Sequence, residues 1–182
     1  MKKRVFDRNE IIKVAYELVK IKGFDNLTVR NIALFMDMST QPIYFHFQNI
    51  RELKLEVLEY IWKKCINSRK NVIYSEDVLV NYFCKMTHFF SKKINLYEKI
   101  FQDNKIDIEY FYHISEEYCF QNILKEERIE VHKAMRRRIH FKWMICFHGL
   151  IQYSHLGIEN IEHLFVEIFE DIIYSSMKEM AK

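Results

Sequence analysis

Hydrophobic residues recur every three to four positions along much of this chain, and no alternation of period two persists beyond residue 72. This spacing places apolar side chains on one face of an α-helix, whereas a half-buried strand would need the shorter period. The chain also contains only three glycines and one proline, so few of its connections are tight turns that depend on those residues. The pattern therefore predicts an all-α protein with short polar connections between its helices.

The most specific pattern lies in residues 28–53, where two short apolar-periodic segments flank a polar break. It predicts helices over residues 29–36 and 40–46, with Ser39 as the N-cap of the second helix. Pro42 falls in the first turn of that helix, where a missing backbone N–H leaves no hydrogen bond unmade. Two helices joined by so tight a turn are typical of a helix-turn-helix, whose second helix lies in the major groove of DNA.

Longer helices are predicted on both sides of this motif. One spans residues 8–22 and ends at Gly23, and another runs from about Asn49 to Ser68. The sequence predicts a DNA-binding module over residues 1–52, followed without a flexible linker by a helical domain over residues 53–182. Further helices are predicted over residues 76–93, 95–103, 106–120, 126–153 and 159–179.

The distribution of charge agrees with a DNA-binding module at the N-terminus. Residues 1–52 contain nine Lys and Arg against six acidic residues, whereas the remaining residues hold nineteen of each sign. The formal excess of +3 therefore lies entirely in the segment with the helix-turn-helix. Positive charge at this place favours contact with the phosphate backbone.

Several classes of protein are disfavoured by features that the sequence lacks. No stretch approaches the roughly 18 uninterrupted apolar residues of a membrane span, and the first residues have no apolar signal core, which favours a cytoplasmic protein. The four cysteines form no CxxC pair and are predicted to be reduced and buried. The lack of a Gly-rich phosphate loop, a nucleophile elbow and an HExxH motif argues against an enzyme.

The segment from Ile11 to Leu53 resembles the DNA-binding domain of the tetracycline-repressor (TetR/AcrR) family of bacterial regulators. Two positions depart from the family pattern. Asp37 replaces the usual glycine in the turn, and Ile50 replaces a lysine at the start of the next helix, where Arg51 could supply the phosphate contact. Asp tolerates a left-handed backbone better than most residues, so the turn survives. The resemblance rests on Gly23-Phe24, Leu27-Thr28-Val29, Ile32-Ala33 and the run Ser39-x-x-x-Ile43-Tyr44-x-His46-Phe47.

The resemblance implies an Ω-shaped homodimer, in which each subunit has a three-helix DNA-binding module and a helical C-terminal domain. In most members, a small molecule bound by the C-terminal domain alters the spacing of the two recognition helices and lifts repression of a nearby gene. We therefore predict a repressor that is released from a near-palindromic operator by an apolar or aromatic inducer. No cofactor is predicted.

The second helix of the motif carries most of the candidate DNA contacts. Gln41 lies at its N-terminal end and can bond both N6 and N7 of adenine, while Thr40 and Pro42 offer apolar contact to a thymine methyl group. By the resemblance, Tyr44 and His46 contact phosphates; the alternative is that Tyr44 packs in the core and His46 is solvated. The complete predicted set is Thr28, Arg30, Ser39, Thr40, Gln41, Pro42, Tyr44, His46 and Arg51.

The last two predicted helices have apolar stripes wider than one core requires. We predict that each helix buries one side in its own domain and the other against a symmetry mate, so that four helices form a dimer interface. The alternative is that both helices lie wholly inside one domain. The residues predicted for the interface are Trp143, Phe147, Ile151, Ile161, Phe165, Ile168, Phe169 and Ile172.

The second half of the chain is rich in aromatic residues, some of which are predicted to line a mostly apolar pocket for a small molecule. Which of them do so is left open. Cys84 and His88 are spaced i, i+4, and His148 and His155 flank Gly149, so metal or haem sensing is an alternative, although two ligands do not make a zinc site. A second alternative is a co-regulator that responds to a partner protein and has no small-molecule pocket.

Overall fold

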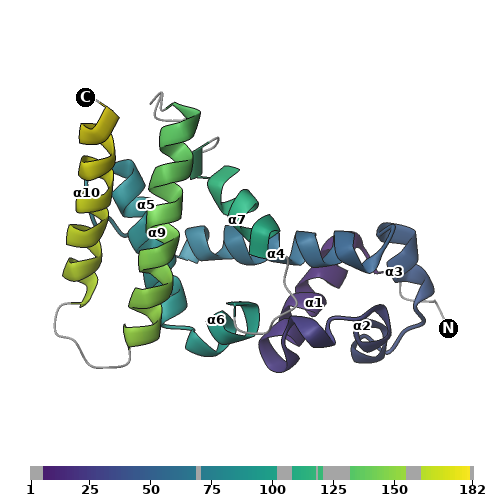
Figure 1. Ribbon diagram of the computed structural model, residues 1–182. Helices are drawn as coiled ribbons and strands as arrows, with labels where there is room; N and C mark the ends of the chain where they lie inside the picture. Colours follow the sequence, from purple (N-terminus) through teal and green to yellow (C-terminus); the bar gives the residue numbers. More distant parts are fainter. Residues whose placement is uncertain are drawn as a thin grey trace. The chain divides into compact units, whose positions relative to one another are not determined.

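The computed structural model describes residues 6–68, 71–101, 108–117, 119–120, 132–154 and 161–180. In these ranges the chain forms helices and no strands, which confirms the predicted all-α fold for the part described (Figure 1). None of the helices in these ranges is both long enough and apolar enough to cross a membrane. The chain divides into two compact units, the first formed by Met1–Lys64 with Asn95–Phe111 and the second by Cys65–Ile94 with Tyr112–Lys182.

The first unit extends further along the chain than the predicted module of residues 1–52, because a later segment packs against its helices. The ring of Trp62 in α4 meets the ring of Phe111 edge-on, with 5.2 Å between the centroids. Lys99 of α6 also donates a hydrogen bond to the carbonyl of Ile21 in α1. The unit contains α1 (Arg8–Lys22), α2 (Val29–Phe35), α3 (Gln41–His46) and most of α4 (Ile50–Ser68) and α6 (Ile94–Phe101).

Local signals in the sequence account for both ends of α1, which matches the helix predicted over residues 8–22. The Asp7 carboxylate accepts the backbone N–H of Glu10 at 2.7 Å, and the Glu10 carboxylate accepts the backbone N–H of Asp7 at 3.0 Å. This reciprocal pair forms a capping box. Gly23 ends the helix with a φ of 78°, in the left-handed region that favours glycine.

The second helix of the predicted helix-turn-helix begins slightly later than expected. It starts at Gln41 and its N-cap is Thr40, so the prediction that Ser39 caps this helix is wrong. Thr40 already has helical dihedral angles, with φ −73° and ψ −15°, and its side chain makes no capping bond. Its carbonyl instead accepts the N–H groups of Ile43 and Tyr44, so backbone bonds alone begin the helix.

The turn between α2 and α3 contains Asp37, whose φ of 50° lies in the left-handed region. A short polar side chain tolerates this conformation better than an apolar one, while glycine adopts it without steric cost. We therefore expect Asp37→Ala to have a free energy of unfolding about 1 kcal/mol lower than that of Asp37→Gly. Urea unfolding measures the difference, and equal stabilities for the two variants would contradict the argument.

The second unit is built around three helices. The Asp77 carboxylate begins α5 by accepting the N–H groups of Leu79 and Val80 at 2.9 and 3.0 Å. α9 and α10 run side by side in opposite directions (Figure 1). The part of the predicted helix over residues 126–131 lies outside the described residues. The helices of this unit are α5 (Val78–Ser91), α9 (Lys133–Tyr153), α10 (Ile161–Met180) and residues 112–117 of α7 (Ile108–Glu117).

Aromatic rings fill the centre of the second unit. Trp143 of α9 stacks on Phe83 of α5, with ring centroids 4.8 Å apart and an angle of 12° between the planes. Phe169 of α10 meets Phe83 edge-on at 5.8 Å, and Phe147 of α9 lies 5.1 Å from Trp143. Such stacked and edge-on pairs stabilise a core beyond the apolar area that they bury. They join α5, α9 and α10 into one core.

This core contains six of the eight residues predicted for a dimer interface. A side chain that is buried inside the second unit of one subunit is not exposed for contact with a second subunit. In the single subunit these six lie where α5, α9 and α10 pack together, and the dimer interface itself stays a prediction. The six are Trp143, Phe147, Ile151, Phe165, Phe169 and Ile172, while Ile161 and Ile168 are half-buried.

Candidate nucleic-acid interface

All nine predicted DNA-contact residues lie in the first unit, at the start of α2, in the turn, on α3 and at the start of α4. Pro42 and His46 are half-buried. The other seven side chains are exposed, so the unit leaves most of the set accessible to an outside ligand. The exposed seven are Thr28, Arg30, Ser39, Thr40, Gln41, Tyr44 and Arg51.

The α3 segment has a buried face and an exposed face. Ile43 and Phe47 are almost fully buried, whereas Gln41, Tyr44 and Phe45 are exposed. Phe45, which is 85% exposed, is absent from the predicted set of DNA contacts. A helical period of 3.6 residues turns position 45 by about 200° from both 43 and 47. The sequence therefore did contain a signal that Phe45 faces outward with Gln41 and Tyr44.

The C-terminal end of α3 is held from inside the unit. The Nε2 atom of His46 lies 2.9 Å from the carbonyl oxygen of Phe6, which can only accept, so this nitrogen carries a proton and donates it. Arg8 of α1 donates to the carbonyl of His46, and its guanidinium lies 4.4 Å from the centroid of the Phe47 ring. We therefore assign His46 to positioning α3, because its Nε2 proton is not available for the predicted phosphate contact.

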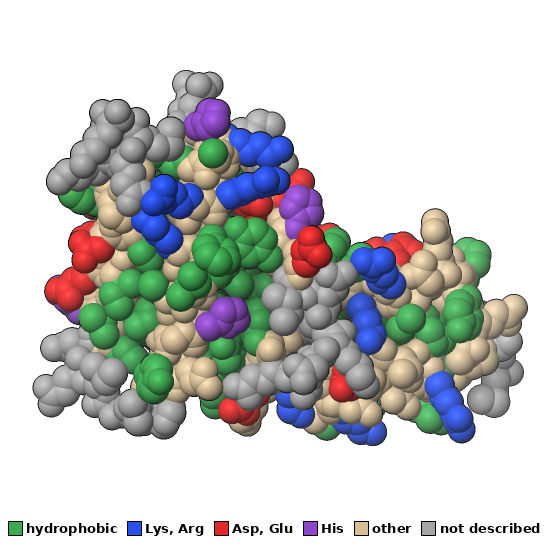
Figure 2. Space-filling model, viewed as in Figure 1, with side chains coloured by type: hydrophobic (Ala, Val, Ile, Leu, Met, Phe, Trp, Pro, Cys, Tyr) green, Lys and Arg blue, Asp and Glu red, His purple; other side chains and the backbone are tan. Residues whose placement is uncertain are grey.

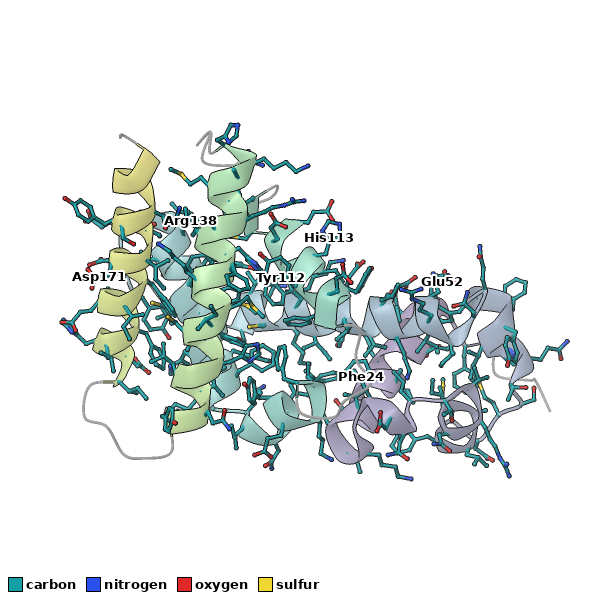
Figure 3. All side chains as sticks on the ribbon, viewed as in Figure 1. Phe24, Glu52, Tyr112, His113, Arg138 and Asp171 are labelled. Carbon is teal, nitrogen blue, oxygen red and sulfur yellow. The ribbon has the colours of Figure 1, made fainter. Side chains whose placement is uncertain are left out.

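Arg8 also joins α1 to the first turns of α4. Its Nη2 atom lies 2.6 Å from Oε1 of Glu52, and its Nε atom lies 3.0 Å from Oε2 of Glu56. Figure 3 shows Glu52 near the beginning of α4. We call these contacts of Arg8, with Glu52, Glu56 and the His46 carbonyl, the Arg8 network. It ties α1, α3 and α4 together at one place.

The charges of the Arg8 network reinforce one another. Hydrogen bonds to Glu56 and then Glu52 raise the pKa of Arg8, so its guanidinium stays charged. The hydrogen bond from Arg8, followed by one from the backbone N–H of Gln48 at 2.7 Å, lowers the pKa of Glu52. These groups are partly exposed, so water screens their attraction, and the network acts mainly through its geometry.

The start of α2 offers a second group of polar atoms. The Thr28 hydroxyl accepts the backbone N–H of Asn31 at 3.2 Å, which caps the helix and leaves the hydroxyl proton to donate outward. Arg30 is exposed in the first turn. Because the N-terminal end of a helix carries partial positive charge, these groups suit a phosphate.

Comparison with known proteins identifies the family to which this surface belongs. Residues 11–57 match the bacterial regulatory proteins of the tetR family. The N-terminal segment is therefore a DNA-binding domain of the tetR family. The match covers the helix-turn-helix and the first turns of α4, which include the Arg8 partners Glu52 and Glu56. The chain is thus a DNA-binding transcription regulator and not an enzyme.

The fold of the whole regulator is similar to that of a solved structure, the dihydroxyacetone kinase operon activator DhaS. The TM-score is 0.53 at 19% sequence identity, and the likeness covers 92% of this chain and 94% of that chain. At this identity the likeness establishes a shared fold and no shared ligand or gene. No curated protein matches the regulator by sequence.

The positions considered for a metal are occupied by other contacts in the second unit. Nδ1 of His88 lies 2.7 Å from Oε1 of Glu162, and burial raises the pKa of the Cys84 thiol to about 12. His148 is half-buried, and His155 lies outside the described residues. Within the described ranges, no group of three or more His, Cys, Asp or Glu side chains is placed to hold a metal ion.

Proposed function

We propose that this regulator is a cytoplasmic homodimer that binds a near-palindromic operator and is released from it by a small molecule held in the second unit. The observation that carries the DNA-binding role is the exposed face of α3, which presents Gln41, Tyr44 and Phe45. The aromatic core of the second unit supports an apolar or aromatic inducer. For the effect on transcription of the regulated gene, repression is the first candidate. DhaS is named an operon activator, so activation is the second.

The exposed residues of the first unit take distinct roles in this proposal. Gln41 reads an adenine through its side-chain amide, and Thr40 and Pro42 contact thymine methyl groups beside it. Tyr44 bonds phosphate through its hydroxyl group, which fixes register and carries no sequence information. The other phosphate contacts are Thr28, Arg30, Ser39 and Arg51.

The dimer interface is placed, in this proposal, on the exposed face of α9 and α10. Phe141 and Ile145 of α9 are each 59% exposed, and Tyr174 of α10 is 68% exposed. Figure 2 shows hydrophobic side chains gathered over these two helices. Exposed apolar patches of this kind are typical of protein interfaces, and a second copy of the chain can cover one by two-fold symmetry. In the alternative function, a co-regulator, a partner protein covers the same face.

Selection from random DNA tests the proposal directly. The full-length regulator is expected to enrich a near-palindromic site, and fluorescence anisotropy is expected to show two chains per site. Affinity should fall steeply as salt rises, because phosphate contacts release counterions. Failure to enrich any sequence would contradict the DNA-binding role. A single chain per site would contradict the homodimer and favour the co-regulator.

Two substitutions on α3 separate base reading from phosphate contact. We expect Gln41→Ala to reduce discrimination at one base pair of each half-site by about tenfold, because the amide no longer bonds the base. Tyr44→Phe is the matched variant. It removes a phosphate contact, so it should weaken binding by the same factor for every DNA sequence and leave the sequence preference unchanged. Anisotropy with a set of single-base operator variants measures both effects. Unchanged sequence preference in Gln41→Ala would remove Gln41 from the base-reading role.

A further inference from the structure

Two neighbouring rings of α9 each carry a buried nitrogen atom without a hydrogen-bond partner among the residues that the structure describes. These atoms are Nδ1 of His140 and Nε1 of Trp143, and both side chains are fully buried. The two residues are three positions apart on α9, with 5.2 Å between their ring centroids. A buried polar atom without a partner costs free energy and is uncommon in folded proteins. Two such atoms on neighbouring rings therefore point to a missing partner.

The hydrogen bonds around His140 determine what its Nδ1 atom requires. The Ser115 hydroxyl has one proton, which we assign to the carbonyl of Tyr112 at 2.9 Å, so that its oxygen accepts from Nε2 of His140 at 2.7 Å. Nε2 therefore carries the ring proton. Burial lowers the pKa of His140 to about 3, so the ring is neutral near pH 7. Nδ1 is then an acceptor, while Nε1 of Trp143 is a donor.

The rings around this pair are mostly apolar. The Tyr112 ring meets the His140 ring edge-on with 4.5 Å between centroids, and Figure 3 shows Tyr112 beside α9. Phe83 and Phe147 pack against the indole of Trp143. A neutral imidazole and an indole offer no opposite charge, so a charged ligand would lose its hydration without compensation. The site therefore favours an uncharged molecule with an aromatic or apolar body.

We propose that His140 and Trp143 form the polar end of a small-molecule site inside the second unit, and that its ligand is an uncharged aromatic or apolar compound with a hydroxyl group. A hydroxyl group supplies the proton that Nδ1 accepts and an oxygen that accepts the indole N–H. The inference rests on the proposed function, because it assumes that the second unit binds the small molecule. It adds the chemical class of that molecule and two of the residues that recognise it.

The indole N–H signals of the full-length protein test this site without DNA. The chain has two tryptophans, and Trp62→Phe identifies which signal in a proton–nitrogen correlation spectrum belongs to Trp143. Phenol is the probe, and toluene, which carries a methyl group in place of the hydroxyl, is the matched control. We expect phenol to shift the Trp143 signal saturably and to bind at least about tenfold more tightly than toluene. The Trp62 signal, from the first unit, should stay unchanged.

A substitution at His140 tests the role of the acceptor. His140→Phe keeps an aromatic ring and removes Nδ1, so the preference for phenol over toluene should fall to within about twofold. If this variant does not fold, the wild-type titrations still decide the question. Equal affinity for the two probes, no saturable shift with phenol, or a bound water that persists beside Trp143 at saturating phenol would each overturn the proposal. None of these outcomes involves operator binding, so they are distinguishable from failure of the DNA-binding function.

Discussion

Ile145→Asp is expected to convert the regulator from a dimer to a monomer and to weaken operator binding at least about a hundredfold. Ile145 is 59% exposed on α9 in the single subunit. In the proposed dimer its face packs against a second subunit, where the new carboxylate would be buried without a partner. Loss of the dimer then removes the simultaneous binding of two half-sites. Sedimentation velocity measures the first effect, and fluorescence anisotropy with the selected operator measures the second.

Ile73→Asp is the matched control for this experiment. Ile73 is 77% exposed in the same unit and lies outside α9 and α10, so the same chemical change falls on a surface site. The control should stay dimeric, with an operator affinity within about twofold of the wild type. A dimeric Ile145→Asp with wild-type affinity would place the interface elsewhere.

The contrast between the two units shows what hydrophobic periodicity can and cannot predict. In the first unit, the sequence predicts α1 correctly, because Gly23 and a single apolar face mark its end and its buried side. In the second unit, the sequence identifies Trp143 and Phe169 as apolar stripe residues but not what covers them. Their partner is Phe83 of α5, which is about 60 and 86 residues away along the chain. A stripe therefore predicts burial without distinguishing a core from an interface.

Polar contacts between residues far apart in the chain could not be predicted from the sequence either. By helical period His46 lies about 60° from the buried Ile43, at the border between the buried and exposed faces of α3, and its ring bonds the carbonyl of Phe6, 40 residues earlier. Arg8 contributes to the positive charge of the N-terminal segment, yet its partners Glu52 and Glu56 lie 44 and 48 residues later. The composition gives the number of such charges but does not indicate which of them form ion pairs. These contacts position the DNA-facing helix, although none of the residues was predicted for that role.

Arg8→Met tests whether the Arg8 network positions α3 for DNA. The substitution keeps an unbranched side chain but removes all the donors, so the carboxylates of Glu52 and Glu56 lose their cation. We expect the free energy of unfolding to fall by about 1–2 kcal/mol, a range that allows for solvent screening of partly exposed groups. Affinity for every DNA sequence should fall more than about tenfold, because α3 loses a contact at its C-terminal end. Urea unfolding and anisotropy measure the two effects.

Variants on the same helix separate geometry from charge. Lys22→Met removes one exposed positive charge from the last turn of α1. It should leave the free energy of unfolding close to that of the wild type and the DNA affinity within about twofold of the wild type. Arg8→Lys keeps the charge but cannot hold two carboxylates and a carbonyl in the same planar arrangement, so it should give an intermediate loss. If Arg8→Lys behaved like the wild type, the charge of Arg8 would account for its effect without any positioning of α3.

The pH dependence of stability provides an independent measure of the same network. Because Arg8 lowers the pKa of Glu52 in the folded state, the contribution of this pair is fully present above the ordinary Glu pKa of about 4.3. It is lost as pH falls through the lowered pKa of the folded protein, when the carboxylate takes up a proton. Glu52→Gln should therefore lower stability near pH 7 and flatten its decline below about pH 4. A decline as steep as that of the wild type would mean that Glu52 draws no stability from Arg8, and that α3 is positioned by the remaining contacts alone.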